Sequence, residues 1–150
     1  MNACGKMLIE SIQNDINIGV NCLEKAVGTG KAIVFYANPR TDEVGVNIRF
    51  GKFDNININN IYDTHKALCF ADENMDQEDI FWNLQGENWS PNGEANALIH
   101  MKGLSHTSMS VGDIIAYPIE NSSQYKIMFV ANVGFRCLGF VEKSQVSRTL

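Results

Sequence analysis

Side chains that could carry chemistry are densest in one short run of the sequence. Within nine positions this run holds four hydroxyl groups, one imidazole and one carboxyl group, at Ser105, His106, Thr107, Ser108, Ser110 and Asp113. Such groups could supply a nucleophile and its base, or hydroxyl and amide donors for an anionic ligand. A small hydrolase or transferase would use His106 as the base and Ser108 or Ser110 as the nucleophile, with Asp113 orienting the histidine.

The same run also has a purely structural interpretation. A catalytic triad is recognised by its geometry and not by neighbours in sequence, and no Gly-x-Ser-x-Gly elbow is present here. Small hydroxyl residues also satisfy the backbone of tight loops, where Gly112 would supply the turn and Asp113 would cap it. Exposure of His106 and Ser108 in a pocket would favour a site, whereas burial of the loop with Met109 in the core would favour folding.

Motifs for a cofactor or a metal are missing from the sequence. The run Gly28-Thr29-Gly30-Lys31 lacks the earlier glycine of a phosphate-binding loop, and a strand pattern follows it instead of a helix. The four cysteines are widely spaced, with no histidine at ligand spacing, at Cys4, Cys22, Cys69 and Cys137. We therefore expect no cofactor, no metal, and free thiols in a reducing cytoplasm.

Length and composition indicate one domain. The chain has 150 residues, of which 45% are hydrophobic and 19% charged, as in ordinary globular domains with a single core. Its net charge of -5 lacks the basic footprint of nucleic-acid binders, so we do not expect nucleic acid as a partner. Neither a signal segment nor an apolar run of membrane-spanning length is visible, which predicts a cytoplasmic protein without membrane contact.

About three helices are predicted from the sequence. Apolar residues recur at a spacing of mostly four over residues 6–27, which predicts an amphipathic helix. A second helix should begin at Asp76, in an acidic cluster formed by Asp72, Glu73, Asp76, Glu78 and Asp79. Such a cluster is typical of a solvated helix start, and the alternative is a partner-binding surface. A third helix is predicted over residues 90–103, with Ser90 as N-cap and Pro91 at its first position.

Strands account for most of the remaining chain. β-rich or alternating patterns mark residues 31–37, 44–50, 61–71, 113–117, 125–131 and 135–142, and turn formers between the first two predict a hairpin. Helices and strands in segregated runs favour an α+β fold over a doubly wound one. We therefore predict one α+β domain over residues 1–150, with a mixed or antiparallel sheet of about five or six strands and about three helices. The run 105–113 would connect the third helix to a strand.

Three parts of the sequence together resemble a known family. These parts are Trp89-Ser-Pro-Asn-Gly-Glu-Ala95, then Gly103-Leu-Ser-His-Thr-Ser-Met-Ser-Val-Gly-Asp113, then Tyr125 and Gly134-Phe135. They are similar to the YodL-like domains of bacteriophages and other mobile elements, in which a His-Ser-x-Ser-Val-Gly-Asp run is closed by Gly-Phe. The resemblance covers roughly residues 62–140, whereas residues 1–60 remain unmatched. It supplies no catalytic residues.

The resemblance implies an accessory protein that acts inside an infected bacterium. Small acidic accessory proteins of this kind commonly work by binding, so we expect a protein that modulates or inhibits a host protein or a host defence without catalysis. The candidate contacts lie where resemblance and polar density coincide, at Trp89, Asn92, Glu94, Ser105, His106, Thr107, Ser108, Ser110 and Asp113. Two alternatives remain, namely the hydrolase or transferase described above and a protein that sequesters a signal nucleotide or another small anion.

Overall fold

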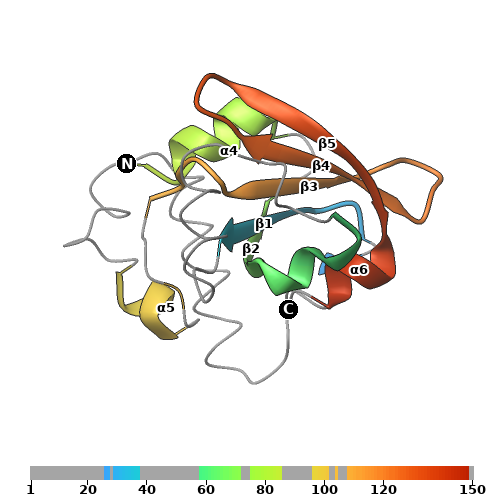
Figure 1. Cartoon of the computed structure of the whole chain (residues 1–150), viewed down its shortest axis with the longest axis horizontal. Coiled ribbons are helices and arrows are strands. Elements are labelled where there is room, and N and C mark those ends of the chain that lie inside the picture. Colours follow the sequence, from blue (N-terminus) through green and yellow to red (C-terminus); the bar gives the residue numbers. More distant parts are fainter. Residues whose placement is uncertain are drawn as a thin grey trace.

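A five-stranded antiparallel sheet organises the molecule (Figure 1). The computed structural model describes residues 26–27, 29–37, 58–71, 75–85, 96–101, 104 and 108–148. The strands follow the spatial order β2-β1-β3-β4-β5, and every neighbouring pair is antiparallel. Their bounds are β1 (Ala32–Ala37), β2 (His65–Ala71), β3 (Ile114–Pro118), β4 (Gln124–Val130) and β5 (Phe135–Glu142).

Strand β1 lies inside the sheet and is buried along its whole length. Strand β2 pairs with one of its edges from Ala32 to Ala37, and β3 pairs with the other edge from Ile33 to Phe35. Because both faces of this strand are covered, its successive residues are all apolar, which explains the sequence Ala-Ile-Val-Phe-Tyr-Ala. The hairpin partner predicted for this strand, 44–50, lies outside the described residues. Both neighbours of β1 come instead from further along the chain.

Helices cover both faces of the sheet. On one face, α4 (Gln77–Asn83) and α5 (Asn96–Met101) pack against alternate strand residues in a cluster that includes Val34, Tyr36, Leu68, Ile80, Leu84, Ile99, Ile115 and Met128. On the other face, the 3-10 helix η2 (Ile58–Asp63) and α6 (Lys143–Ser147) close a second cluster that includes Ile33, Phe35, Ile61, Ile114, Ile127, Phe129 and Val146. Because successive side chains of a strand point to opposite faces of the sheet, the core has two layers, one on each face.

The cap predicted for the second helix is confirmed. The Asp76 carboxyl group accepts a hydrogen bond from the Asp79 backbone N–H at 2.8 Å, which satisfies one of the donors left free at the start of α4. The acidic residues of this first turn are exposed, as expected for a solvated helix start. Helix α5 is the described part of the helix predicted over 90–103, whereas Ser90 and Pro91 lie outside the described residues.

Other elements correct the prediction from sequence. The strand predicted over 61–71 begins only at His65, because the preceding residues form η2 and the turn that follows it, where the Thr64 N–H donates to Ile61 O at 3.1 Å. Helix α6 was not predicted, and only Ala26 and Val27 of the helix predicted over 6–27 are described. The α+β fold and its antiparallel sheet are confirmed. Two of the three predicted helices are seen, in whole or in part, as α4 and α5, whereas the first lies almost entirely outside the described residues.

Strand β5 is bent where η2 packs on it. A register shift between Ile127 and Met128 leaves Leu138 without a partner in β4, as in the bulges that are common on edge strands. Next to it, Gly139 has a φ of +132°, and a Cβ atom there would lie 2.9 Å from Cδ1 of Ile58. The positive φ favours glycine here, and the absence of a side chain lets the flexible end of Ile58 on η2 pack closely on β5. None of the helices in the described part of the chain has the length and apolar character that a membrane crossing requires.

Candidate functional site

The structure describes residues 108–113 of the predicted polar loop 105–113. Of the nine candidate contacts, Ser108, Ser110 and Asp113 are described. The other six lie outside the described residues, namely Trp89, Asn92, Glu94, Ser105, His106 and Thr107. Leu104, which precedes the loop, is buried against the face that α4 and α5 cover. The loop does lead from the helical segment to β3, as the sequence predicted.

Asp113 is a fully buried residue that joins three parts of the fold. Its Oδ1 atom accepts the Ala37 backbone N–H at 2.9 Å, and its Oδ2 atom accepts the Ser110 backbone N–H at 2.8 Å. Its backbone N–H donates to Ser110 O, and its backbone oxygen accepts from the Val130 N–H at 2.9 Å. The side chain therefore holds the end of β1 to the loop before β3.

His65 forms the second buried polar contact at this end of β1. Its Nε2 atom lies 2.7 Å from Gly112 O, and its Nδ1 atom lies 2.8 Å from Thr64 Oγ1. Because a carbonyl oxygen can only accept, Nε2 carries the proton and donates. Gly112 has a φ of +100°, a turn conformation that suits glycine. We call Thr64, His65, Ser110, Gly112 and Asp113 the β1-end cluster.

Residues 108–113 of the loop are tied to their surroundings by hydrogen bonds within the chain. Met109 is buried in the core, its N–H donates to Leu84 O, and its oxygen accepts the Gln85 Nε2 group at 2.7 Å. The Ser110 hydroxyl donates to Ser108 O at 2.9 Å. The bonds of residues 108–113 therefore agree with the interpretation in which this loop serves folding. Three of the predicted ligand contacts in the loop, at residues 105–107, lie outside the described residues.

Burial also shifts the pKa of Tyr36, the tyrosine beside this cluster. Complete burial raises the pKa of Tyr36 well above its ordinary value, and the charges of Asp113 and Cys69 raise it further. The phenol consequently stays neutral at physiological pH. Together with Asp113 and His65, it makes this end of β1 a closed, internally bonded region.

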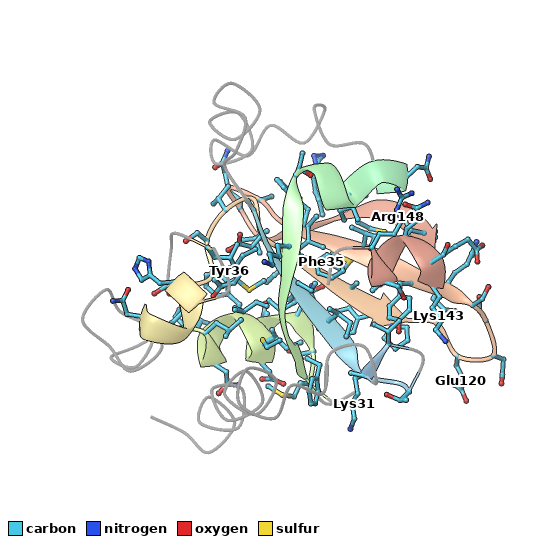
Figure 2. The ribbon with its side chains drawn as sticks, turned by 90° about the horizontal axis from the view of Figure 1, so that it is seen from below. Lys31, Phe35, Tyr36, Glu120, Lys143 and Arg148 are labelled. Atoms are coloured by element: carbon cyan, nitrogen blue, oxygen red, sulfur yellow. The ribbon has the colours of Figure 1, made fainter. Side chains whose placement is uncertain are left out.

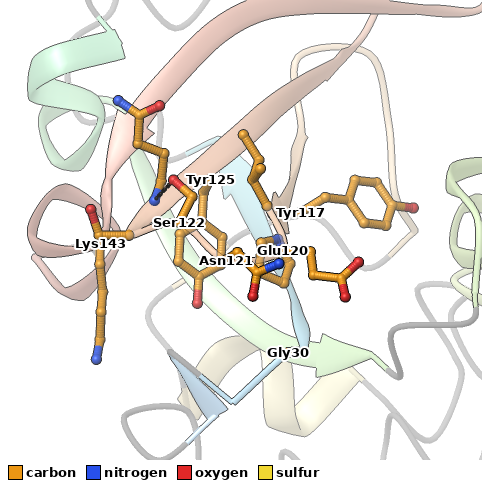
Figure 3. A pocket seen from close by; sticks show the side chains of 11 residues that line it. Gly30, Tyr117, Glu120, Asn121, Ser122, Tyr125 and Lys143 are labelled. Atoms are coloured by element: carbon orange, nitrogen blue, oxygen red, sulfur yellow. Dashed lines mark hydrogen bonds between the residues drawn. The ribbon is translucent and has the colours of Figure 1, made fainter.

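The opposite end of β1 borders an open pocket (Figure 3). Its volume is about 560 Å³, and it is lined by the β3–β4 hairpin from Tyr117 to Tyr125, by Gly30 in the turn before β1, and by Lys143 at the start of α6. We call it the hairpin pocket. The sequence predicted only a turn at 118–124, because nothing in a local pattern shows that Gly30 and Lys143 meet this turn.

Backbone and side-chain bonds fix the tip of the hairpin. The Ile119 N–H donates to Gln124 O at 3.0 Å, and the Ser122 N–H donates to Ile119 O at 3.2 Å. The Ser122 hydroxyl oxygen accepts the Gln124 N–H at 3.1 Å. Asn121 has a φ of +58°, the left-handed conformation that asparagine tolerates better than most residues. The loop therefore presents its polar groups in a defined arrangement.

Two titratable groups beside the pocket have shifted pKa values. Hydrogen bonds from the Ser123 hydroxyl at 2.8 Å and the Gln124 amide at 3.1 Å lower the pKa of the exposed Glu142 carboxyl group. Burial raises the pKa of Tyr117 well above its ordinary value, and the charges of Asp76 and Asp79 raise it further. Neither group needs a ligand to explain its shift.

Among the described residues, three large apolar side chains are exposed, one each on α4, in the turn before β5 and on β5. Trp82 on α4 is 69% exposed, Val133 before β5 is 93% exposed, and Phe140 on β5 is 52% exposed. Trp82 stacks edge-on against Phe81 at 5.6 Å between ring centroids, and Phe81 stacks in the same way against Phe135 at 6.2 Å. We call Trp82, Val133 and Phe140 the β5 surface.

Comparison of the chain with protein-family models, with curated proteins and with solved structures gives no match in any of the three. Within the described ranges, no group of three or more His, Cys, Asp or Glu side chains is arranged to hold a metal ion. The function must therefore be inferred from the chain's own pocket, exposed side chains and buried polar groups.

Proposed function

We propose that the chain is a bacteriophage or mobile-element accessory protein that binds a host protein without catalysing a reaction, and that it binds through the β5 surface. The observation that carries this proposal is the exposed Trp82 ring. It is supported from below by Phe81 and Phe135, which connect it to the core. Tryptophan held in this way loses little entropy on binding and is frequent among the residues that dominate interface affinity.

The expected occupant is an extended segment of the host protein. In the described sheet, β5 is an edge strand of eight residues, so its outer backbone groups can pair with an added strand. Phe140 is exposed beside this edge, where an apolar side chain of the added strand would cover it. The backbone would supply affinity, and the aromatic side chains would select the sequence.

Binding is favoured over turnover by the position of Asp113. The catalytic hypothesis requires this carboxyl group to orient His106 beside a serine. Both of its oxygens already accept backbone N–H groups, from Ala37 and Ser110, in a fully buried site. The Ser110 hydroxyl likewise donates to a backbone oxygen within the loop. These bonds give Asp113 and Ser110 a role in folding.

The test is capture of a stoichiometric partner from a bacterial lysate, followed by affinity measurement with the purified partner. We expect Trp82→Ser and Phe140→Ser each to weaken binding by at least about 10-fold, as for truncated interface anchors. Glu78→Ala is the matched control, because Glu78 is exposed on the same helix as Trp82. A partner that binds all three variants as tightly as the natural chain would refute the proposed surface.

A further inference from the structure

We infer that His65 is a pH-sensitive switch: it takes up a proton inside the folded chain, and its protonated form holds the start of β2 more firmly to η2 and to the loop before β3. The residue is only 2% exposed, and its two ring nitrogens meet the Gly112 backbone and the Thr64 hydroxyl group. The switch uses none of the residues of the β5 surface and does not depend on the proposed host partner.

The Thr64 hydroxyl group is the part that responds to the proton. Its oxygen lies 2.8 Å from Nδ1 of His65 and 3.3 Å from Ile61 O, but its single hydrogen can be donated to only one of them. When the imidazole is neutral and Nε2 donates to Gly112 O, the hydroxyl group must donate to Nδ1. When the imidazole is protonated, Nδ1 donates to the hydroxyl oxygen, and the hydroxyl hydrogen turns to Ile61 O.

The protonated state has the more complete set of hydrogen bonds. The ring makes two bonds in either state, but both are charge-assisted in the imidazolium, and such bonds are stronger than those between neutral groups. The bond from the Thr64 hydroxyl group to Ile61 O is added, because a carbonyl oxygen that already accepts the Thr64 N–H at 3.1 Å can accept a second donor. The added bond ties the start of β2 to η2.

The buried carboxyl group of Asp113 offsets the cost of burying a positive charge. Asp113 follows Gly112 directly and accepts the N–H of Ala37, the residue opposite His65 in the sheet. Both of its oxygens accept N–H groups, as those of an ionised carboxyl group do, and its charge raises the pKa of Tyr36 in the same region. A lone buried charge is costly, whereas a second charge of opposite sign compensates it.

Asp113 is the described charge that acts on His65. Three further titratable groups lie on β1 and β2, namely Tyr36, Lys66 and Cys69. Burial raises the pKa of Tyr36, which keeps it neutral. Lys66 alternates with His65 along β2 and points to the other face of the sheet, where Cys69 belongs to the core cluster. The described side chains of η2 do not titrate, being those of Ile58, Asn59 and Ile61.

The first experiment follows the ring ¹⁵N signals of His65 by NMR in the full chain from pH 8 to pH 5, with His65→Gln for assignment. We expect a proton on Nε2 alone at high pH and on both nitrogens at low pH, with the fold intact. Thr64→Val should lower the proton affinity of His65 by about 3-fold to 10-fold, because the imidazolium loses an acceptor. Thr64→Ser keeps the hydroxyl group and is the matched control.

Asp113→Asn should lower the proton affinity in the same direction, because the compensating charge is removed. A ring that stays neutral down to pH 5 would overturn the inference. Equal proton affinities in Thr64→Val and Thr64→Ser would do the same, since the hydroxyl group would then have no part in binding the proton.

The second experiment compares the urea midpoints of the natural chain and His65→Gln between pH 5 and pH 8. The folded chain should hold the proton more tightly than the unfolded chain, so the stabilisation is complete at the acid end and is lost as the pH rises through the folded midpoint. The advantage of the natural chain over His65→Gln should therefore shrink towards pH 8. The other two histidines are present in both chains and cancel. An advantage that stays constant or grows with pH would mean that His65 is a structural residue and not a switch.

Discussion

The two ends of β1 use polar residues in opposite ways. At its carboxyl end, Asp113 and His65 are buried, and their polar atoms bond to backbone groups or to a neighbouring side chain. At its amino end, Lys143 and Glu120 line an open pocket without pairing with each other. Figure 2 shows Lys31, Glu120 and Lys143 on one side of the molecule and Tyr36 on the other.

This difference shows that polar residues that are dense in the sequence can serve to hold the fold together. The loop with the most hydroxyl and charged groups in its sequence uses Ser110 and Asp113 to satisfy backbone donors and acceptors at a strand junction. An unpaired buried donor is costly, so such bonds are required for folding. Charged groups that remain open to solvent are not needed in this way and are available for a ligand.

The largest effect that tests this comparison is expected at Asp113. Replacement by alanine leaves the buried N–H groups of Ala37 and Ser110 without their acceptor. We expect the free energy of unfolding to fall by about 3–5 kcal/mol, measured by urea denaturation. Asp113→Asn keeps one carbonyl oxygen and should lose less. An alanine variant as stable as the natural chain would show that this end of β1 is not held as we describe.

A smaller loss is expected at His65. In His65→Leu the apolar bulk remains, but Gly112 O loses its donor and Thr64 loses its partner on the imidazole ring. The free energy of unfolding should fall by about 2 kcal/mol. His65→Gln supplies an amide donor and should recover part of the loss in the same denaturation series. If leucine and glutamine have equal effects, then packing and not hydrogen bonding is what matters at this position.

Local features of the fold could be predicted from the sequence, whereas tertiary partners could not. The Asp76 cap and the strands of the last third were predicted, because caps and alternation depend on residues close in the chain. Helix α6 has five residues and one buried side chain, Val146, so it has no apolar period to detect. The pairing of β1 with β2 and β3 depends on distant segments that a hairpin pattern cannot indicate.

The candidate sites likewise depend on contacts between residues that are distant in the sequence. Asp113 stood out by its chemistry, but its acceptor role depends on Ala37, which lies 76 positions away. The hairpin pocket requires Gly30, Asn121 and Lys143 to meet, and no local motif connects them. The exposure of Trp82 could not be predicted either. The apolar spacing of α4 indicates that Ile80 and Leu84 are buried, but it does not show whether Trp82 faces the core or the solvent.

A weaker, pH-dependent effect is expected at Glu142. Its pKa in the folded chain lies below the ordinary value of 4.5, because Ser123 and Gln124 donate hydrogen bonds to the charged form. The resulting stabilisation is present above the unfolded pKa and is lost as the pH falls through the folded pKa. In Glu142→Gln the urea midpoint should therefore fall less between pH 7 and pH 3 than in the natural chain. An identical decrease in both proteins would exclude this contribution.

The smallest effects are expected for the two charges of the hairpin pocket. Lys143 and Glu120 are exposed, and neither pairs with the other, so the fold does not use their charges. Lys143→Gln and Glu120→Gln should each change the free energy of unfolding by no more than about 0.5 kcal/mol, as is usual for surface positions. Urea denaturation at low and high salt provides the measurement, because a hidden ionic contribution would weaken as salt rises.

Lys126→Gln is the matched control for these two variants, since Lys126 is an exposed lysine on β4 of the same sheet. All three should unfold at the same urea concentration as the natural chain. A loss of more than about 1 kcal/mol at Lys143 or Glu120, but not at Lys126, would mean that the charges hold the hairpin in place. The two ends of β1 would then both be structural, and the contrast between them would disappear.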